Sequence, residues 1–114
     1  MKAKEKRKGP RVEARRLVAF RRSEDRGTSD YEGFVRSLNL GLGGLLLETY
    51  YLFEPGEPLR LEILSGDGVL RAQGEVVYRE GSGDRFRVGV RFTEVTKEAR
   101  HGLVEEVEFG LQEP

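Results

Sequence analysis

The sequence predicts an all-β fold, a barrel or sandwich of six strands followed by one C-terminal helix. Two observations support this prediction. Short segments in which apolar and polar residues alternate recur at regular spacing, and clusters of Gly, Pro, Asp and Ser separate them. After Val95 the apolar residues recur at every fourth position instead, which is typical of a helix. The length of 114 residues suits one compact domain with a single core.

Six segments are predicted as strands. The clearest is residues 85–92, in which every second side chain is large and apolar. Charged or glycine-rich turns separate the segments, and residues 23–30 (SEDRGTSD) are the longest of these turns. The predicted strands are residues 15–22, 31–40, 45–50, 59–63, 70–79 and 85–92.

The same alternation assigns side chains to the two faces of a strand. In the second segment, one face is predicted to carry Phe34, Leu38 and Leu40, and the other Val35, Ser37 and Asn39. In the fifth segment, one face is predicted to carry Leu70, Ala72, Gly74, Val76 and Tyr78.

The C-terminal helix is predicted to begin after Thr96, whose hydroxyl can accept a hydrogen bond from a free backbone N–H of the first turn. Ala99, Leu103 and Val107 follow at four-residue intervals and predict the face that packs on the strands. Gly102 costs this helix about 1 kcal/mol relative to alanine.

Charge is distributed unevenly along the chain. Residues 1–22 contain ten Lys or Arg and two Asp or Glu, a net charge of +8, and the rest of the chain carries −8. A basic arm of this kind is a solvated tail, a nucleic-acid arm or a binder of small phosphorylated ligands. The acidic body disfavours a broad nucleic-acid interface, because it repels the phosphates.

Several function classes lack their signatures in this sequence. There is no cysteine, and His101 is the single histidine, most simply an exposed helix side chain, so no metal site is expected. No serine lies in a nucleophile elbow and no phosphate-binding loop of the nucleotide hydrolases is present, so we expect no enzyme. No apolar run is long enough to span a membrane, and the basic start is not followed by a signal-peptide core, so no membrane insertion is expected.

Two short motifs carry the candidate binding chemistry. The first is Arg7-Lys8-Gly9-Pro10-Arg11, since an arginine can hold a phosphate or the O6/N7 edge of guanine with two hydrogen bonds. The second is Asn39-Leu40-Gly41-Leu42-Gly43-Gly44, where a polar side chain ends a strand and glycines let a ligand approach the backbone. Each has a plain alternative: a solvated basic tail for the first, and a tight turn or bulge that requires positive φ for the second.

In this order on this strand pattern, the two motifs resemble the PilZ domain, a bacterial receptor for cyclic di-GMP. The family pattern is RxxxR before the first strand and [D/N]xSxxG between the second and third. The segment Val88-Gly89-Val90-Arg91-Phe92 also looks like the closing strand of the family, and the resemblance covers roughly residues 6–108.

The resemblance implies a six-stranded antiparallel β-barrel with a C-terminal α-helix. Residues 1–11 would form a flexible basic arm, and residues 12–114 the barrel and helix. The resemblance also implies that Arg7 and Arg11 clamp the dinucleotide, and that Asn39 and the Gly44 backbone complete the site. Gly89 either leaves room for a flat base or marks a strand bulge. The ligand-binding residues expected on this basis are Arg7, Arg11, Asn39, Gly41, Gly44 and Gly89.

Gly41 departs from the family pattern, because it stands where the family has serine. The expected function is cyclic di-GMP-dependent second-messenger signalling in the cytoplasm, through a conformational change and a protein partner. The alternative is a PilZ-fold protein-interaction module with weak or no cyclic di-GMP binding, because Gly41 has no hydroxyl to donate. No other cofactor is expected.

Overall fold

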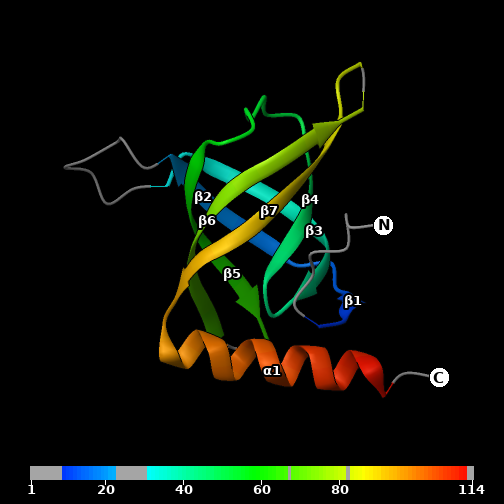
Figure 1. Ribbon diagram of the computed structural model, residues 1–114, viewed down its shortest axis with the longest axis vertical. Coiled ribbons are helices and arrows are strands. Elements are labelled where there is room, and N and C mark those ends of the chain that lie inside the picture. Colours follow the sequence, from blue (N-terminus) through cyan, green and yellow to red (C-terminus); the bar gives the residue numbers. More distant parts are fainter. Residues whose placement is uncertain (1–8, 23–30, 67, 82, 113–114) are drawn as a thin grey trace.

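The computed structural model describes residues 9–22, 31–66, 68–81 and 83–112. The predicted turn at residues 23–30 and residues 1–8 of the predicted arm lie outside this described part. Seven strands and one helix make up the described chain (Figure 1). They are β1 (Arg11–Glu13), β2 (Leu17–Arg22), β3 (Gly33–Gly41), β4 (Gly44–Thr49), β5 (Pro58–Ser65), β6 (Gly68–Glu80), β7 (Phe86–Val95) and α1 (Lys97–Leu111).

Strands β2 to β7 close into a six-stranded barrel. Their order is β3-β2-β5-β6-β7-β4, and β4 pairs back onto β3 to complete the ring. All of these pairings are antiparallel. The predicted all-β barrel with a C-terminal helix is therefore confirmed, and each of the six predicted strands is present with ends shifted by a few residues.

The short strand β1 was not predicted. It pairs with the C-terminal end of β3, while β2 pairs with the N-terminal half of the same strand. The two strands therefore follow one edge of β3 with a break between them. The buried hydroxyl of Ser37 holds this break: it donates to the Ala14 carbonyl at 2.5 Å and accepts from the Arg16 N–H at 2.9 Å.

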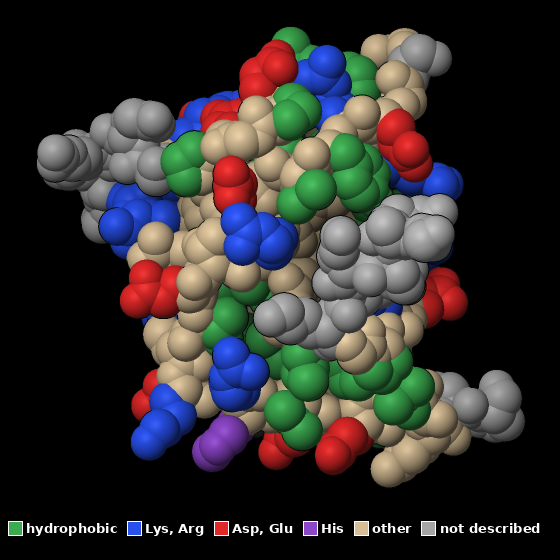
Figure 2. Space-filling model, in the orientation of Figure 1, with side chains coloured by type: hydrophobic (Ala, Val, Ile, Leu, Met, Phe, Trp, Pro, Cys, Tyr) green, Lys and Arg blue, Asp and Glu red, His purple; other side chains and the backbone are tan. Residues whose placement is uncertain are grey.

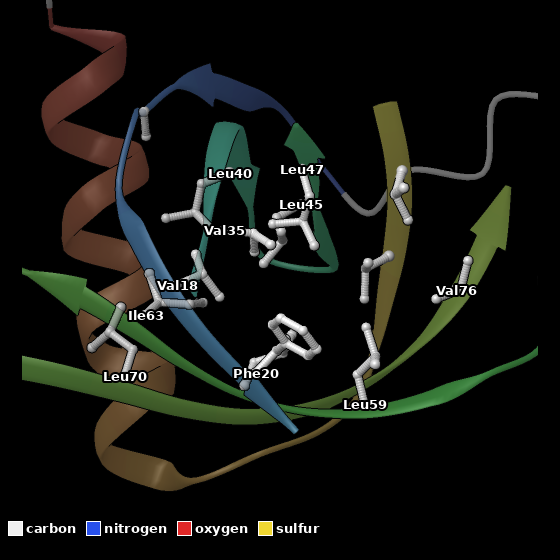
Figure 3. Packing of buried hydrophobic residues seen from close by; sticks show 14 of the residues in the cluster. Val18, Phe20, Val35, Leu40, Leu45, Leu47, Leu59, Ile63, Leu70 and Val76 are labelled. Carbon is white, nitrogen blue, oxygen red and sulfur yellow. The ribbon is translucent and has the colours of Figure 1, made fainter. Parts of the chain in front are cut away.

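The inward faces of the six strands form the core of the barrel. Phe20 lies near its centre, with side chains from β2 to β7 around it (Figure 3). The alternation predicted for β5 and β7 is confirmed, since their inward residues are buried. These core residues include Leu59, Leu61 and Ile63 of β5 and Val88 and Val90 of β7.

A bulge in β3 overturns the face assignment predicted for that strand. Ser37 and Asn39 pair with consecutive residues of β4, so Leu38 is the extra residue. Before the bulge, Ser37 faces inward; after it, Leu40 faces inward and Asn39 faces outward. Phe34, predicted on the same face as Leu40, is instead 60% exposed.

A second bulge, in β6, overturns the prediction for Tyr78. Val76 pairs with Val90 and Tyr78 pairs with Gly89, which leaves Val77 without a partner in the register. Val76 is buried in the core, whereas Tyr78 lies on the outer surface with 43% of its area exposed. One extra residue thus moves Tyr78 from the predicted inner face to the outer one.

Helix α1 lies across one end of the barrel and contacts β6, β1 and β3 (Figure 1). Its predicted cap and packing face are confirmed: the Thr96 hydroxyl accepts from the Ala99 N–H at 3.1 Å, and Ala99, Leu103 and Val107 are buried. Arg16 pairs with Glu106 at 2.8 Å, which links the helix to the segment between β1 and β2.

Two glycines of α1 allow the helix to approach the strands closely. A Cβ atom at Gly102 would lie 2.4 Å from Cδ2 of Leu70, and one at Gly110 would lie 2.6 Å from Cβ of Val12. Gly102 therefore lowers the helix propensity of α1, but it lets the helix pack closely on Leu70. Through Gly110, the end of the helix lies directly against β1.

Candidate ligand-binding site

Arg11 and Asn39 meet on the outer face of the barrel. Arg11 opens β1, and its register places it opposite Gly41, while Asn39 lies opposite Glu13. Nη1 of Arg11 donates to Oδ1 of Asn39 at 3.2 Å. The short strand β1 therefore brings the second arginine of the first motif onto the asparagine of the second motif, 28 residues away in the chain.

The side chain of Arg11 lies over Gly41 and Gly44. A Cβ atom at Gly41 would lie 2.9 Å from Cγ of Arg11, and one at Gly44 would lie 3.2 Å from its Nη2. Neither glycine has positive φ, so the alternative of a turn or bulge that requires it is wrong here. The missing side chains at these positions let the arginine lie close to the barrel.

Gly89 lies farther along the same outer face, beneath an aromatic ring. A Cβ atom there would lie 2.4 Å from Cε2 of Tyr78. Gly89 pairs with Tyr78, next to the bulge in β6, so it is a close-packing position opposite a bulge. The sequence pattern identifies Gly89 but predicts Tyr78 on the inner face, because alternation does not reveal the bulge that turns Tyr78 outward.

Basic side chains flank Gly89 on the outward face of β7. Arg91 pairs with Glu75 at 2.5 Å, and it lies opposite Gly44 in the register. Arg87, two residues before Gly89, is exposed. Acidic and basic side chains are otherwise interspersed over the face shown in Figure 2. The cations near Gly89 suit an anionic ligand, whereas this mixed face does not resemble a broad nucleic-acid interface.

The predicted residues thus divide into three groups. Arg11, Asn39, Gly41 and Gly44 are brought together, Gly89 lies beside them two strands away from Asn39, and Arg7 lies outside the described residues. Arg11 and Asn39 are half-buried, and Gly41, Gly44 and Gly89 are buried. A hollow of about 250 Å³, lined by residues such as Phe34, Tyr50 and Arg85, contains none of the predicted residues.

His101 is exposed on α1, as its simplest interpretation predicted. Within the described ranges, no three His, Cys, Asp or Glu side chains are grouped to hold a metal ion. No helix in this part of the chain has the length and apolar character needed to cross a membrane.

The family model described as the PilZ domain matches residues 5–109. The chain belongs to the PilZ family. The resemblance first drawn from the two motifs is therefore confirmed across nearly the whole chain. No curated protein matches this PilZ chain.

Solved structures of other PilZ-fold proteins share its architecture. The inhibitor of motility from Bacillus subtilis (MotI/DgrA) superposes with a TM-score of 0.74 at 19% identity, over 96% of this chain and 56% of that one. The PilZ domain of YcgR from Escherichia coli, solved with c-di-GMP, superposes with a TM-score of 0.70 at 16% identity, over 95% and 93%. The PilZ domain of CeSA from a cellulose-synthesizing bacterium gives 0.64 at 14% identity, over 92% and 100%.

These identities show a common fold and no more. This PilZ chain spans only about half the length of the motility inhibitor (56%) but nearly all of the YcgR domain (93%). The similarity thus concerns the barrel and its helix, and the chemistry of the site must be argued from the residues of this chain.

Proposed function

We propose that this PilZ domain is a receptor for cyclic di-GMP and has no catalytic activity. The observation that carries the proposal is the position of Arg11, which is held by Asn39 and lies over Gly41 and Gly44 on the outer face of the barrel. An arginine fixed at a surface of this kind can grip a phosphate or a guanine edge without first being ordered.

The chemistry of each residue fits this ligand. The guanidinium of Arg11 donates two parallel hydrogen bonds to a phosphate or to O6 and N7 of guanine, and it can also stack flat on a purine. The amide of Asn39 both donates and accepts, so it suits a base edge. Arg7 would contribute a second guanidinium from the arm, four residues before Arg11.

We further propose that signalling follows from ordering of the arm. Residues 1–11 would close over the bound dinucleotide, and the covered face would then contact a protein partner in the bacterial cytoplasm. The solved complex of the YcgR PilZ domain with c-di-GMP supports the choice of ligand, because that domain shares this fold.

The alternative function is a protein-interaction module that keeps the barrel but binds cyclic di-GMP weakly or not at all. Gly41 is the observation that favours it, since serine in that position would donate a hydrogen bond to the ligand. Losing a hydrogen bond to a charged group weakens binding by about 10- to 150-fold.

Limited proteolysis separates the two functions. Trypsin cleaves after lysine and arginine, and residues 2–8 contain five of them. A receptor whose arm closes over the dinucleotide is expected to be cut there more slowly when cyclic di-GMP is added, and Arg11→Ala to be cut at one rate with or without it. Equal cleavage of the wild-type arm in both conditions would favour the interaction module.

A further inference from the structure

A single row of paired residues crosses four strands of the barrel beside Arg11. Asn39 of β3 pairs with Leu46 of β4, Leu46 pairs with Gly89 of β7, and Gly89 pairs with Tyr78 of β6. Residues paired directly across strands share a face of the sheet. The row therefore connects the arginine-bearing end of the site to an exposed aromatic ring.

Each end of this row is turned outward by a bulge. Strict alternation would put Asn39 on the inner face with Ser37, and Tyr78 on the inner face with Val76. The bulges in β3 and β6 move both side chains to the outer face. Bulges occur often beside binding sites, where they redirect a side chain, and here two of them direct residues to opposite ends of one row.

The ring of Tyr78 leans back over the row. A Cβ atom at Gly89 would lie 2.4, 2.7 and 2.9 Å from Cε2, Cζ and Cδ2 of that ring. Asn39 and Tyr78 are three strand spacings apart, about 14 Å, and the ring reaches back by one spacing. Because the ring covers Gly89, the half-buried Leu46 forms the floor of roughly 10 Å that is left between the ring and Asn39.

We propose that the ring of Tyr78 stacks on one base of the dinucleotide, while Arg11 and Asn39 bind the other end of the dinucleotide. The inference rests on the proposed function and assigns a specificity residue to it. An aromatic ring stacks on any flat base, and a cation at the far end of the floor binds phosphate or a guanine edge. This arrangement recognises a ligand that is flat and anionic.

The test compares Tyr78→Phe and Tyr78→Ala in the intact chain. Calorimetric titration with cyclic di-GMP is expected to give an unchanged Kd for the phenylalanine variant, which keeps the ring. The alanine variant is expected to bind about 5- to 150-fold more weakly, the range for losing one base–aromatic stack. Val77→Ala is the matched control, because Val77 lies in the same bulge and is 53% exposed but outside the row.

Arg11→Ala separates failure of this inference from failure of the proposed function. If Tyr78→Ala binds as tightly as the wild type while Arg11→Ala does not bind, Tyr78 only covers Gly89 and the inference is wrong. If the wild type itself does not bind, both are wrong. Should Tyr78→Ala fail to fold, Tyr78→Leu replaces it, and a Kd equal to that of Tyr78→Phe would overturn the inference.

Discussion

The side chain of Arg11 fills the space in front of Gly41. A Cβ atom at position 41 would lie 2.9 Å from Cγ of Arg11 and 3.1 Å from the Pro10 carbonyl oxygen, so a serine there requires both to shift by a few tenths of an ångström. The sequence alone presents Gly41 as a missing hydroxyl. The structure adds that the glycine also permits the close approach of the arginine.

A comparison of Gly41→Ser with Gly41→Ala separates these two effects. Both variants introduce the Cβ atom, and only serine adds the hydroxyl. We expect the serine variant to bind cyclic di-GMP about 10- to 150-fold more tightly than the alanine variant, the gain from one hydrogen bond to a charged group. Equal Kd values by calorimetry would show that the hydroxyl does not reach the ligand.

Ser37 stabilises the junction between β1 and β2. Its buried hydroxyl joins the ends of β1 and β2, and Ser37→Ala leaves the Ala14 carbonyl and the Arg16 N–H without that partner. We expect the free energy of unfolding in urea to fall by about 1–3 kcal/mol. The exposed hydroxyl of Thr93 provides the control, and a Thr93→Ala variant that loses as much stability would contradict this role.

At the scale of the elements, the bulges in β3 and β6 set the limit of what the sequence predicts. Alternation located six strands and the inward faces of β5 and β7, because β5 is regular and β7 is regular as far as Phe92, where its predicted segment ends. It failed for Phe34 and Tyr78, because one extra residue reverses every later side chain and leaves no mark in composition. β1 was missed because three residues are too few to show a period.

Helix α1 and strand β1 form a contact that links the helix to the site. Val12, which packs against Gly110, is the neighbour of Arg11 in β1. The end of the helix therefore packs directly on the strand that positions the arginine.

The variant Gly110→Ala tests this contact. Helix propensity alone predicts stabilisation by up to about 1 kcal/mol. Packing predicts the opposite, since the new methyl group would lie 2.6–2.8 Å from the side-chain atoms of Val12. We expect a loss of about 1–3 kcal/mol in the free energy of unfolding and weaker binding of cyclic di-GMP. Glu105→Ala, at an exposed position of the same helix, is the control. A Gly110→Ala variant more stable than the wild type would show that β1 does not constrain the helix.

For the whole molecule, closure of the barrel explains why the site lies where it does. β3 pairs with β1, β2 and β4. Its C-terminal end therefore lies between β1, which opens with Arg11, and the start of β4. Only the family resemblance predicted that the motif at residues 7–11 and the motif at residues 39–44 form one site. Their contact depends on long-range pairing between residues 11 and 41, which no local pattern encodes.

In the proposed function, Arg11, fixed on Asn39, forms half of a clamp for cyclic di-GMP. Calorimetric titration of the wild-type chain and of Arg11→Ala with this dinucleotide tests this role, with Arg7→Ala as a second variant for the arm. We expect saturable binding by the wild type and at least about tenfold weaker binding by Arg11→Ala, because a charged hydrogen-bond donor is lost. The absence of any binding heat from the wild type at high micromolar ligand, or equal affinity in the Arg11 variant, would contradict it.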